Sequence, residues 1–134
     1  MTSLALPLAF TRYATAAFLA PWIAMRFTAP EGAAGIAETY YKLGGLGGAV
    51  TLAVGVGWVL LWIAFVLGFK KTISYALVAI FHAVGTAFTI PWLFPGGDTY
   101  NQLFWAAVPV IGAMWLLWAL RAQDTFATFK GRLG

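Results

Sequence analysis

Residues 43–69, LGGLGGAVTLAVGVGWVLLWIAFVLGF, form an apolar segment without a charged side chain. Segments 72–97 and 99–120 are similar, and their ionisable side chains are limited to two tyrosines and one histidine. Each segment exceeds the roughly 20 apolar residues that an α-helix needs to cross the hydrocarbon core of a bilayer. Because backbone polar groups must be paired internally in that layer, we predict membrane-spanning helices at about 46–69, 73–94 and 102–120.

A fourth span is predicted upstream, at about residues 6–27. Only 13 uncharged residues separate Arg12 from Arg26, but the apolar pattern continues beyond both. Arginine can bury its methylene groups while the guanidinium reaches the lipid headgroups, so both side chains are predicted headgroup anchors. A cleaved signal peptide is the competing interpretation. We reject it because these arginines interrupt the apolar core that such a peptide needs.

The composition fits an integral membrane protein, with 62% hydrophobic and 9% charged residues. A soluble domain of 134 residues could not bury so much apolar surface. We therefore expect one all-α domain, residues 1–134, built as a bundle of four transmembrane helices. The chain has no cysteine, which excludes disulfides, thiolate metal sites and thiol catalysis. Its cations form no aromatic-lined patch, so no nucleic-acid partner is expected.

Charge asymmetry predicts the orientation of the four spans, which place both termini on one side. That side holds a single acid, Asp124, and six cations: Arg12, Lys70, Lys71, Arg121, Lys130 and Arg132. The opposite side holds only two cations, Arg26 and Lys42. The positive-inside rule then places both ends in the cytoplasm, in a bacterial inner membrane, with Lys70, Lys71 and Arg121 as further headgroup anchors.

The loop between the first two spans has helix signals. Thr28 and Glu31 have the spacing of a capping box, and Pro30 suits the first turn of a helix. We predict a short interfacial helix from about Pro30 to Leu43, stopped by Gly44 and Gly45. A simple re-entrant connector is the alternative.

The C-terminal end carries two predictions. Arg121 and Asp124 are spaced to pair at the surface or to contact another subunit. Beyond them, an amphipathic tail would lie on the acidic inner leaflet or dock on a soluble partner. The tail residues are Phe126, Phe129, Lys130, Arg132 and Leu133.

Small residues recur at intervals of four in the second and third spans. Tight backbone approach drives helix association in lipid, so these stripes are predicted to pack the two helices together. The positions are Gly44, Gly48, Ala49, Ala53 and Gly57 in the second segment and Ala79, Ala83 and Ala87 in the third.

His82 is the candidate for a ligand site, because it is the only histidine and lies in the middle of the third span. Thr86, Thr89 and Tyr75 share its helix face. A neutral imidazole could bond a quinone carbonyl or a lipid headgroup. The sequence favours a simpler interpretation, a neutral histidine bonded to a backbone carbonyl or hydroxyl of a neighbouring helix.

Other chemistries lack the residues they need. Electron-transfer haem sites use two axial ligands, and only Met25 and Met114 could accompany His82. The predicted spans contain no carboxylate to hold a metal or to carry protons. We therefore expect no metal site and no catalytic residue.

The chain resembles the DoxX-like family of small membrane proteins. The likeness rests on an arginine near the start of the first helix, a Gly-rich second helix after Lys42-Leu43, a basic turn, and HAVGT at 82–86 followed by a closing 109–124 segment. The resemblance implies four spans and association with membrane redox modules, such as the small subunit of thiosulfate:quinone oxidoreductase. Many members of the family have no assigned activity.

Two classes of function follow from these observations. The chain is expected to be a non-catalytic accessory subunit of a respiratory, photosynthetic or other quinone-linked electron-transport complex. Its partners would be lipids and other subunits, or copies of itself. The alternatives are a self-contained quinone- or lipid-binding redox protein centred on His82, and a small transporter component.

Overall fold

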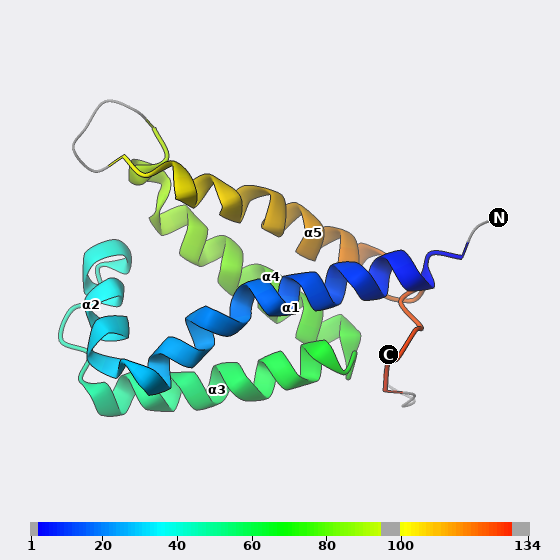
Figure 1. Cartoon of the computed structure of the whole chain (residues 1–134), viewed down its shortest axis with the longest axis horizontal. Coiled ribbons are helices and arrows are strands. Elements are labelled where there is room, and N and C mark those ends of the chain that lie inside the picture. Colours follow the sequence, from blue (N-terminus) through cyan, green and yellow to red (C-terminus); the bar gives the residue numbers. More distant parts are fainter. Residues whose placement is uncertain (1–2, 95–99, 130–134) are drawn as a thin grey trace.

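The computed structural model describes residues 3–94 and 100–129, and those residues are helical with irregular connections. Figure 1 shows the long helices side by side, with a short one across one end. The elements are α1 (Ala5–Thr28), α2 (Pro30–Tyr41), α3 (Gly48–Val66), α4 (Lys71–Phe88), the 3₁₀ turns η1 (Ile90–Trp92) and η2 (Gln102–Ala106), and α5 (Ala107–Ala119).

Three helical segments of the described chain are long and apolar enough to cross a membrane: Gly48–Val66, Lys71–Phe88 and Gln102–Ala119. They confirm the three uninterrupted apolar segments of the sequence as candidate spans. The fourth predicted segment is also helical, since α1 is 24 residues long, but it is not among these three.

The four long helices form a ring. α1 contacts α3 and α5, and α4 contacts the same two helices from the other side. α2 lies across one end of this ring, where it contacts α1, α3 and α4 (Figure 1). The start of α1 and the described segment after α5 lie at the opposite end of the molecule, which we call the Arg12 end (Figure 1). The fold therefore has an α2 end and an Arg12 end.

An apolar core runs between the helices. Its buried members are Leu8, Ala16, Leu19, Ile23, Phe65, Tyr75, Val78, Met114 and Leu117. In the three candidate spans only 17%, 28% and 11% of the residues are buried inside the chain. Large apolar side chains such as Leu60, Ile80 and Trp115 point outward instead. Most of the apolar surface of each span therefore faces away from the chain's own core.

The predicted short helix after the first segment is present as α2 and begins at Pro30 as expected, but it lacks the predicted capping box and ends at Tyr41, before Leu43. Thr28 still belongs to α1, where its hydroxyl donates to the carbonyl of Ala24. Ala29 takes the cap position of α2 without a side-chain hydrogen bond, and Pro30 begins the helix. Proline has no N–H to satisfy there, so the helix starts without the capping box. Lys42 ends it in the left-handed region, at φ 57°.

Prolines lie near the ends of two candidate spans. α4 ends at Phe88, and Pro91 lies in the 3₁₀ turn that follows. The candidate span Gln102–Ala119 begins as 3₁₀ structure, and Pro109 falls in the first turn of α5. A proline in a first turn removes no hydrogen bond, so the kink that it would cause inside a helix does not arise.

The small-residue stripe of α3 does not pack against α4 as predicted. Ala49, Ala53 and Gly57 are exposed, and a side chain added at Gly57 would meet nothing within 4 Å. The close approach lies on another face, where a Cβ at Gly55 would be 3.0 Å from the Phe27 ring. Gly55 thus lets α3 lie against α1. The stripe was assigned to the wrong neighbour because periodicity gives a face and not its partner.

The other predicted packing residues occupy mixed positions. Gly44 lies in the turn before α3, and Gly48 is the first residue of that helix, so the two do not form one helical face. In α4, Ala79 is half-buried against the core and Ala83 is half-buried, whereas Ala87 is exposed. Only part of the predicted α4 stripe therefore faces inward.

Candidate functional site

A charged pair is buried at the Arg12 end. Arg12 of α1 and Asp124, which follows α5, have completely buried side chains, and Arg12 Nη1 lies 3.0 Å from Asp124 Oδ2. It is the only ion pair in residues 3–94 and 100–129. Removing two ions from water costs several kcal/mol per ion, and good geometry with further hydrogen bonds must compensate for that cost. The surrounding contacts supply such bonds.

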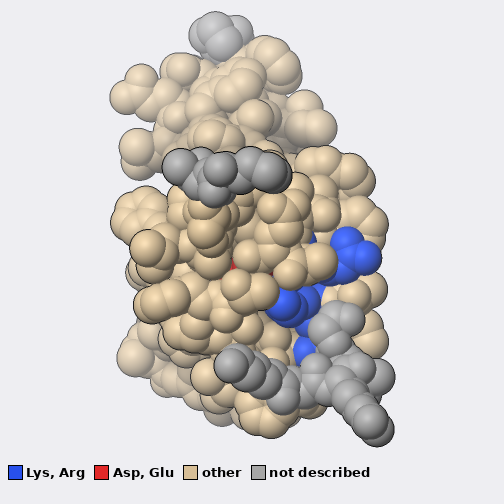
Figure 2. All heavy atoms as spheres, turned by 90° about the vertical axis from the view of Figure 1, so that its right-hand side faces the viewer, with Lys and Arg blue, Asp and Glu red and all other residues tan. Residues whose placement is uncertain are grey.

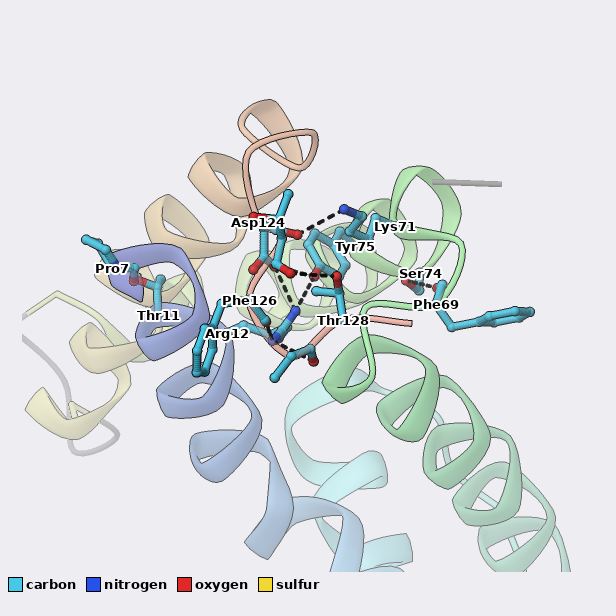
Figure 3. Close-up of polar contacts among 12 residues, drawn as sticks. Pro7, Thr11, Arg12, Phe69, Lys71, Ser74, Tyr75, Asp124, Phe126 and Thr128 are labelled. Atoms are coloured by element: carbon cyan, nitrogen blue, oxygen red, sulfur yellow. Dashed lines mark hydrogen bonds and ion pairs between the residues drawn. The ribbon is translucent and has the colours of Figure 1, made fainter. Parts of the chain in front are cut away.

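Tyr75 of α4 contacts both members of the ion pair. Its hydroxyl donates to the same Asp124 oxygen at 2.5 Å, and Arg12 Nη1 lies 3.3 Å from that hydroxyl oxygen (Figure 3). The Tyr75 ring packs edge-on against Phe65 of α3, with ring centroids 5.0 Å apart. Hydrogen bonds to an ionised carboxylate are stronger than those between neutral groups. We call Arg12, Lys71, Tyr75 and Asp124 the Arg12 cluster.

The segment after α5 folds back over this end of the bundle. Arg12 Nη2 donates to the carbonyl oxygens of Phe126 at 2.9 Å and Ala127 at 3.3 Å. Lys71 Nζ donates to the Asp124 carbonyl at 3.0 Å, and the Phe129 N–H donates to Leu67 O at 2.7 Å. We call residues 121–129 the C-terminal strap. It ties α1, α3 and α4 together.

Gly68 makes room for the strap. Its φ is +60°, in the left-handed region that favours glycine. A Cβ at this position would lie 2.7 Å from Thr128 Cγ2 and 3.0 Å from Arg12 Nη1. The turn between α3 and α4 can therefore accept the strap only with a residue that lacks a side chain.

Three predictions for the charged residues are wrong in this structure: the headgroup contacts of Arg12 and of Lys71, and the pairing of Arg121 with Asp124. Arg12 does not extend toward headgroups, because its guanidinium is enclosed by the strap. Arg121 does not pair with Asp124. Its Nε donates to Thr72 Oγ1 at 3.1 Å, Nη1 donates to Trp118 O at 2.8 Å, and the guanidinium lies over the Trp118 ring. Arg26 is half-buried, Lys70 is exposed, and Lys71 is buried in the Arg12 cluster.

The Arg12 cluster was missed because its members are far apart in sequence. One signal was available, however: Leu8, Arg12, Ala16, Leu19 and Ile23 recur at intervals of three or four and share the buried face of α1. An arginine on the apolar stripe of a helix needs a buried acid, and Asp124 is the only acid that the sequence places on that side. The pairing could have been found by this argument.

Two polar atoms of the cluster have no partner within the described chain. They are Arg12 Nε and Asp124 Oδ1, and both are buried. The other polar side-chain groups of the cluster are hydrogen-bonded to one another or to backbone carbonyls of the strap, so the arrangement is suited to joining helices. Across residues 3–94 and 100–129, no group of three or more His, Asp and Glu side chains could hold a metal ion.

The residues predicted to bind a ligand make local contacts. His82 Nε2 lies 3.3 Å from the Ala107 carbonyl oxygen, and its ring packs edge-on against Phe18 at 5.6 Å between centroids. The Thr86 and Thr89 hydroxyls donate to backbone carbonyls of α4, at His82 and Thr86 respectively. These contacts are those of a histidine that joins α4 to α1 and α5.

An apolar groove of about 300 Å³ lies between α1 and α5. Phe18 lines this groove and its ring also packs against His82, which is not itself a lining residue. The lining residues are Phe10, Thr11, Ala14, Thr15, Phe18, Pro109, Val110 and Ala113. Their chemistry suits a hydrocarbon chain more than a polar ligand.

Aromatic side chains close the α2 end. Tyr40 packs against Trp92 and Phe104, with ring centroids 5.1 and 5.2 Å apart. Tyr41 packs against Phe88, and burial raises its pKa although the charge of Arg26 acts in the opposite direction. These contacts join α2 to the ends of α4 and α5.

The chain matches no protein-family model, and comparisons with curated proteins and with solved structures gave no match either.

Proposed function

We propose that the protein is a four-span integral membrane protein of the bacterial cytoplasmic membrane. In this proposal α1 spans the membrane in addition to the three candidate spans, and both ends lie in the cytoplasm. The proposed role of the protein is that of a non-catalytic accessory subunit of a quinone-linked or other redox membrane complex, as its resemblance to DoxX-like proteins implies. α1 supports the span count, because it is a 24-residue helix and the arginine on its buried face, Arg12, is neutralised by Asp124.

The outward-facing stripe of α3 is the observation that carries the role of subunit. Ala49, Ala53 and Gly57 are exposed on one helix face, and the chain itself does not cover them. In lipid, small residues favour helix association because they let two backbones approach closely. This face is therefore suited to a helix of another subunit, while the large apolar side chains around it are suited to lipid.

Purification of the tagged full chain in a mild detergent tests the proposal. A subunit should elute with stoichiometric partners, and those partners should include components of an electron-transport complex. Gly57→Leu should weaken that association because a large side chain would separate the helices. Val56→Leu is the matched control, since Val56 is also exposed but lies outside the stripe. Elution of the wild-type chain alone would contradict the proposal.

A second candidate function rests on the groove between α1 and α5. Its apolar lining and its place beside Phe18 and His82 suit the isoprenoid tail of a quinone or the acyl chain of a lipid. In that case the chain would be a self-contained ligand-binding protein.

Binding of a quinone to the purified protein tests this second candidate. Ala14→Trp should fill the groove and abolish binding, whereas Ala24→Trp places the same side chain at an exposed position of α1 outside the groove. His82→Leu then separates a direct contact from a packing role. If the histidine only packs, binding should survive this substitution.

A further inference from the structure

Burial of Asp124 changes the charge of the surface at the Arg12 end. Asp124 is the one acid that the sequence places on this side, and the structure encloses its carboxylate completely. Figure 2 faces this end and shows Lys and Arg side chains (blue) gathered on it. Acidic atoms (red) are visible only below the surface. The described part of this surface is therefore cationic.

The positive charge is also in excess inside the cluster. Arg12 and Lys71 both bond to Asp124, but Lys71 reaches only its backbone carbonyl. One carboxylate cannot neutralise two cations. Lys70 and Arg121 add two more positive charges, and neither forms an ion pair within the described residues. An anion from outside would lower the electrostatic cost of this arrangement.

Arg121 and Lys70 both lie at the start of α4. Arg121 is bonded to Thr72 in the first turn of α4, and exposed Lys70 immediately precedes that helix. The bonds to Thr72 and Trp118 use Arg121 Nε and Nη1, and among the described residues Nη2 has no acceptor. Trp118 donates to Thr72 O at 3.2 Å beneath the guanidinium. A tryptophan beside a cation is typical of the headgroup level of a membrane.

We propose that Lys70 and Arg121 bind the headgroup phosphate of an anionic phospholipid from the leaflet that covers the Arg12 end. This proposal rests on the proposed membrane placement and names a lipid partner for it. A guanidinium with a free N–H edge and a flexible ammonium suit phosphate recognition. A diacyl lipid also brings apolar chains to the exposed apolar side chains nearby, such as Ile73 and Trp115.

Titration of the purified full chain in a nonionic detergent tests the proposal. Short-chain phosphatidylglycerol should raise the midpoint of thermal unfolding, and native mass spectrometry should show a retained lipid. Phosphatidylcholine and inorganic phosphate at equal concentration should do neither. Each cation near a membrane surface contributes enough that its loss should weaken binding of phosphatidylglycerol about fivefold. The variants are Lys70→Gln and Arg121→Gln, and the matched control is Lys42→Gln at the α2 end.

Three results would overturn the proposal: equal stabilisation by phosphatidylcholine, unchanged affinity in Lys70→Gln, or an equal loss in Lys42→Gln. If only inorganic phosphate bound, the site would recognise a soluble anion and not a lipid. If Arg121→Gln failed to fold, Lys70→Gln would decide, because Lys70 is exposed. Failure here would leave the subunit role intact, because that role is tested by partners at the α3 face.

Discussion

Arg12 of α1 and Asp124 of the C-terminal strap form a buried ion pair across 112 positions of sequence, with Nη1 and Oδ2 3.0 Å apart. The pair joins the first helix to the segment that follows the last. An arginine on the buried apolar face of a helix is costly until its acid is in place. The strap therefore completes the bundle, and the chain reaches its full stability only after α5 and the strap have folded onto α1.

Removal of the acid should be strongly destabilising. Asp124→Ala leaves Arg12 buried without a counter-charge, and breaking a buried pair in this way costs about 3–5 kcal/mol. Thermal and denaturant unfolding in detergent would measure the loss. Glu38→Gln is the control, since Glu38 is exposed and should change stability little. The double variant Arg12→Leu, Asp124→Leu should recover much of the loss, because no unpaired charge remains. A double variant as unstable as the single one would contradict this account.

The Tyr75 hydroxyl should contribute separately. Tyr75→Phe keeps the ring against Phe65 but removes the hydrogen bond to Asp124 Oδ2, and a bond to a charged group contributes about 1.5–3 kcal/mol. Equilibrium unfolding of the variant in detergent gives the value. Tyr100→Phe is a matched control, because Tyr100 is an exposed tyrosine before η2. Equal effects of the two substitutions would show that the hydroxyl of Tyr75 has no special role.

Hydropathy predicted the helical segments well because spans of the required length leave few alternatives. The three apolar segments, the helix at α1 and the helix at α2 all appear in the structure. Helix ends were predicted less well: α2 begins at Pro30 as expected but stops at Tyr41, and α4 stops at Phe88, before Pro91. Local sequence is sufficient to predict where helices form, because each helix pairs the hydrogen-bonding groups of its own backbone.

Tertiary contacts were harder to predict, because they depend on which faces meet. Arg12 and Arg121 have similar positions near predicted span ends, yet one is enclosed and the other lies over Trp118. The small-residue stripe of Ala53 and Gly57 has the right period but the wrong neighbour. Gly55, which does contact α1, has no feature in sequence that separates it from Gly57.

Gly68 should tolerate no side chain. Gly68→Ala adds a Cβ at 2.7 Å from Thr128 and places alanine at φ +60°. A non-glycine residue in the left-handed region costs about 1–2 kcal/mol even before the clash. We expect lower thermal stability and faster proteolysis at the strap, measured by limited digestion. Gly112→Ala is the control, because a Cβ there meets nothing within 4 Å. Equal stability of the two variants would show that the strap does not depend on this turn.

Tyr41 should make the stability of the α2 end depend on alkaline pH. Burial raises its pKa above the ordinary tyrosine value of about 10, so the folded state holds the phenol proton longer than the unfolded chain does. The stability gained from this difference is complete below the unfolded pKa and is lost as pH rises through the folded pKa. Tyr41→Phe removes the titration, so the unfolding midpoint of the wild type should fall relative to that of the variant above about pH 10. If the wild type and Tyr41→Phe kept a constant difference across this range, Tyr41 would ionise equally well in the folded and unfolded chains.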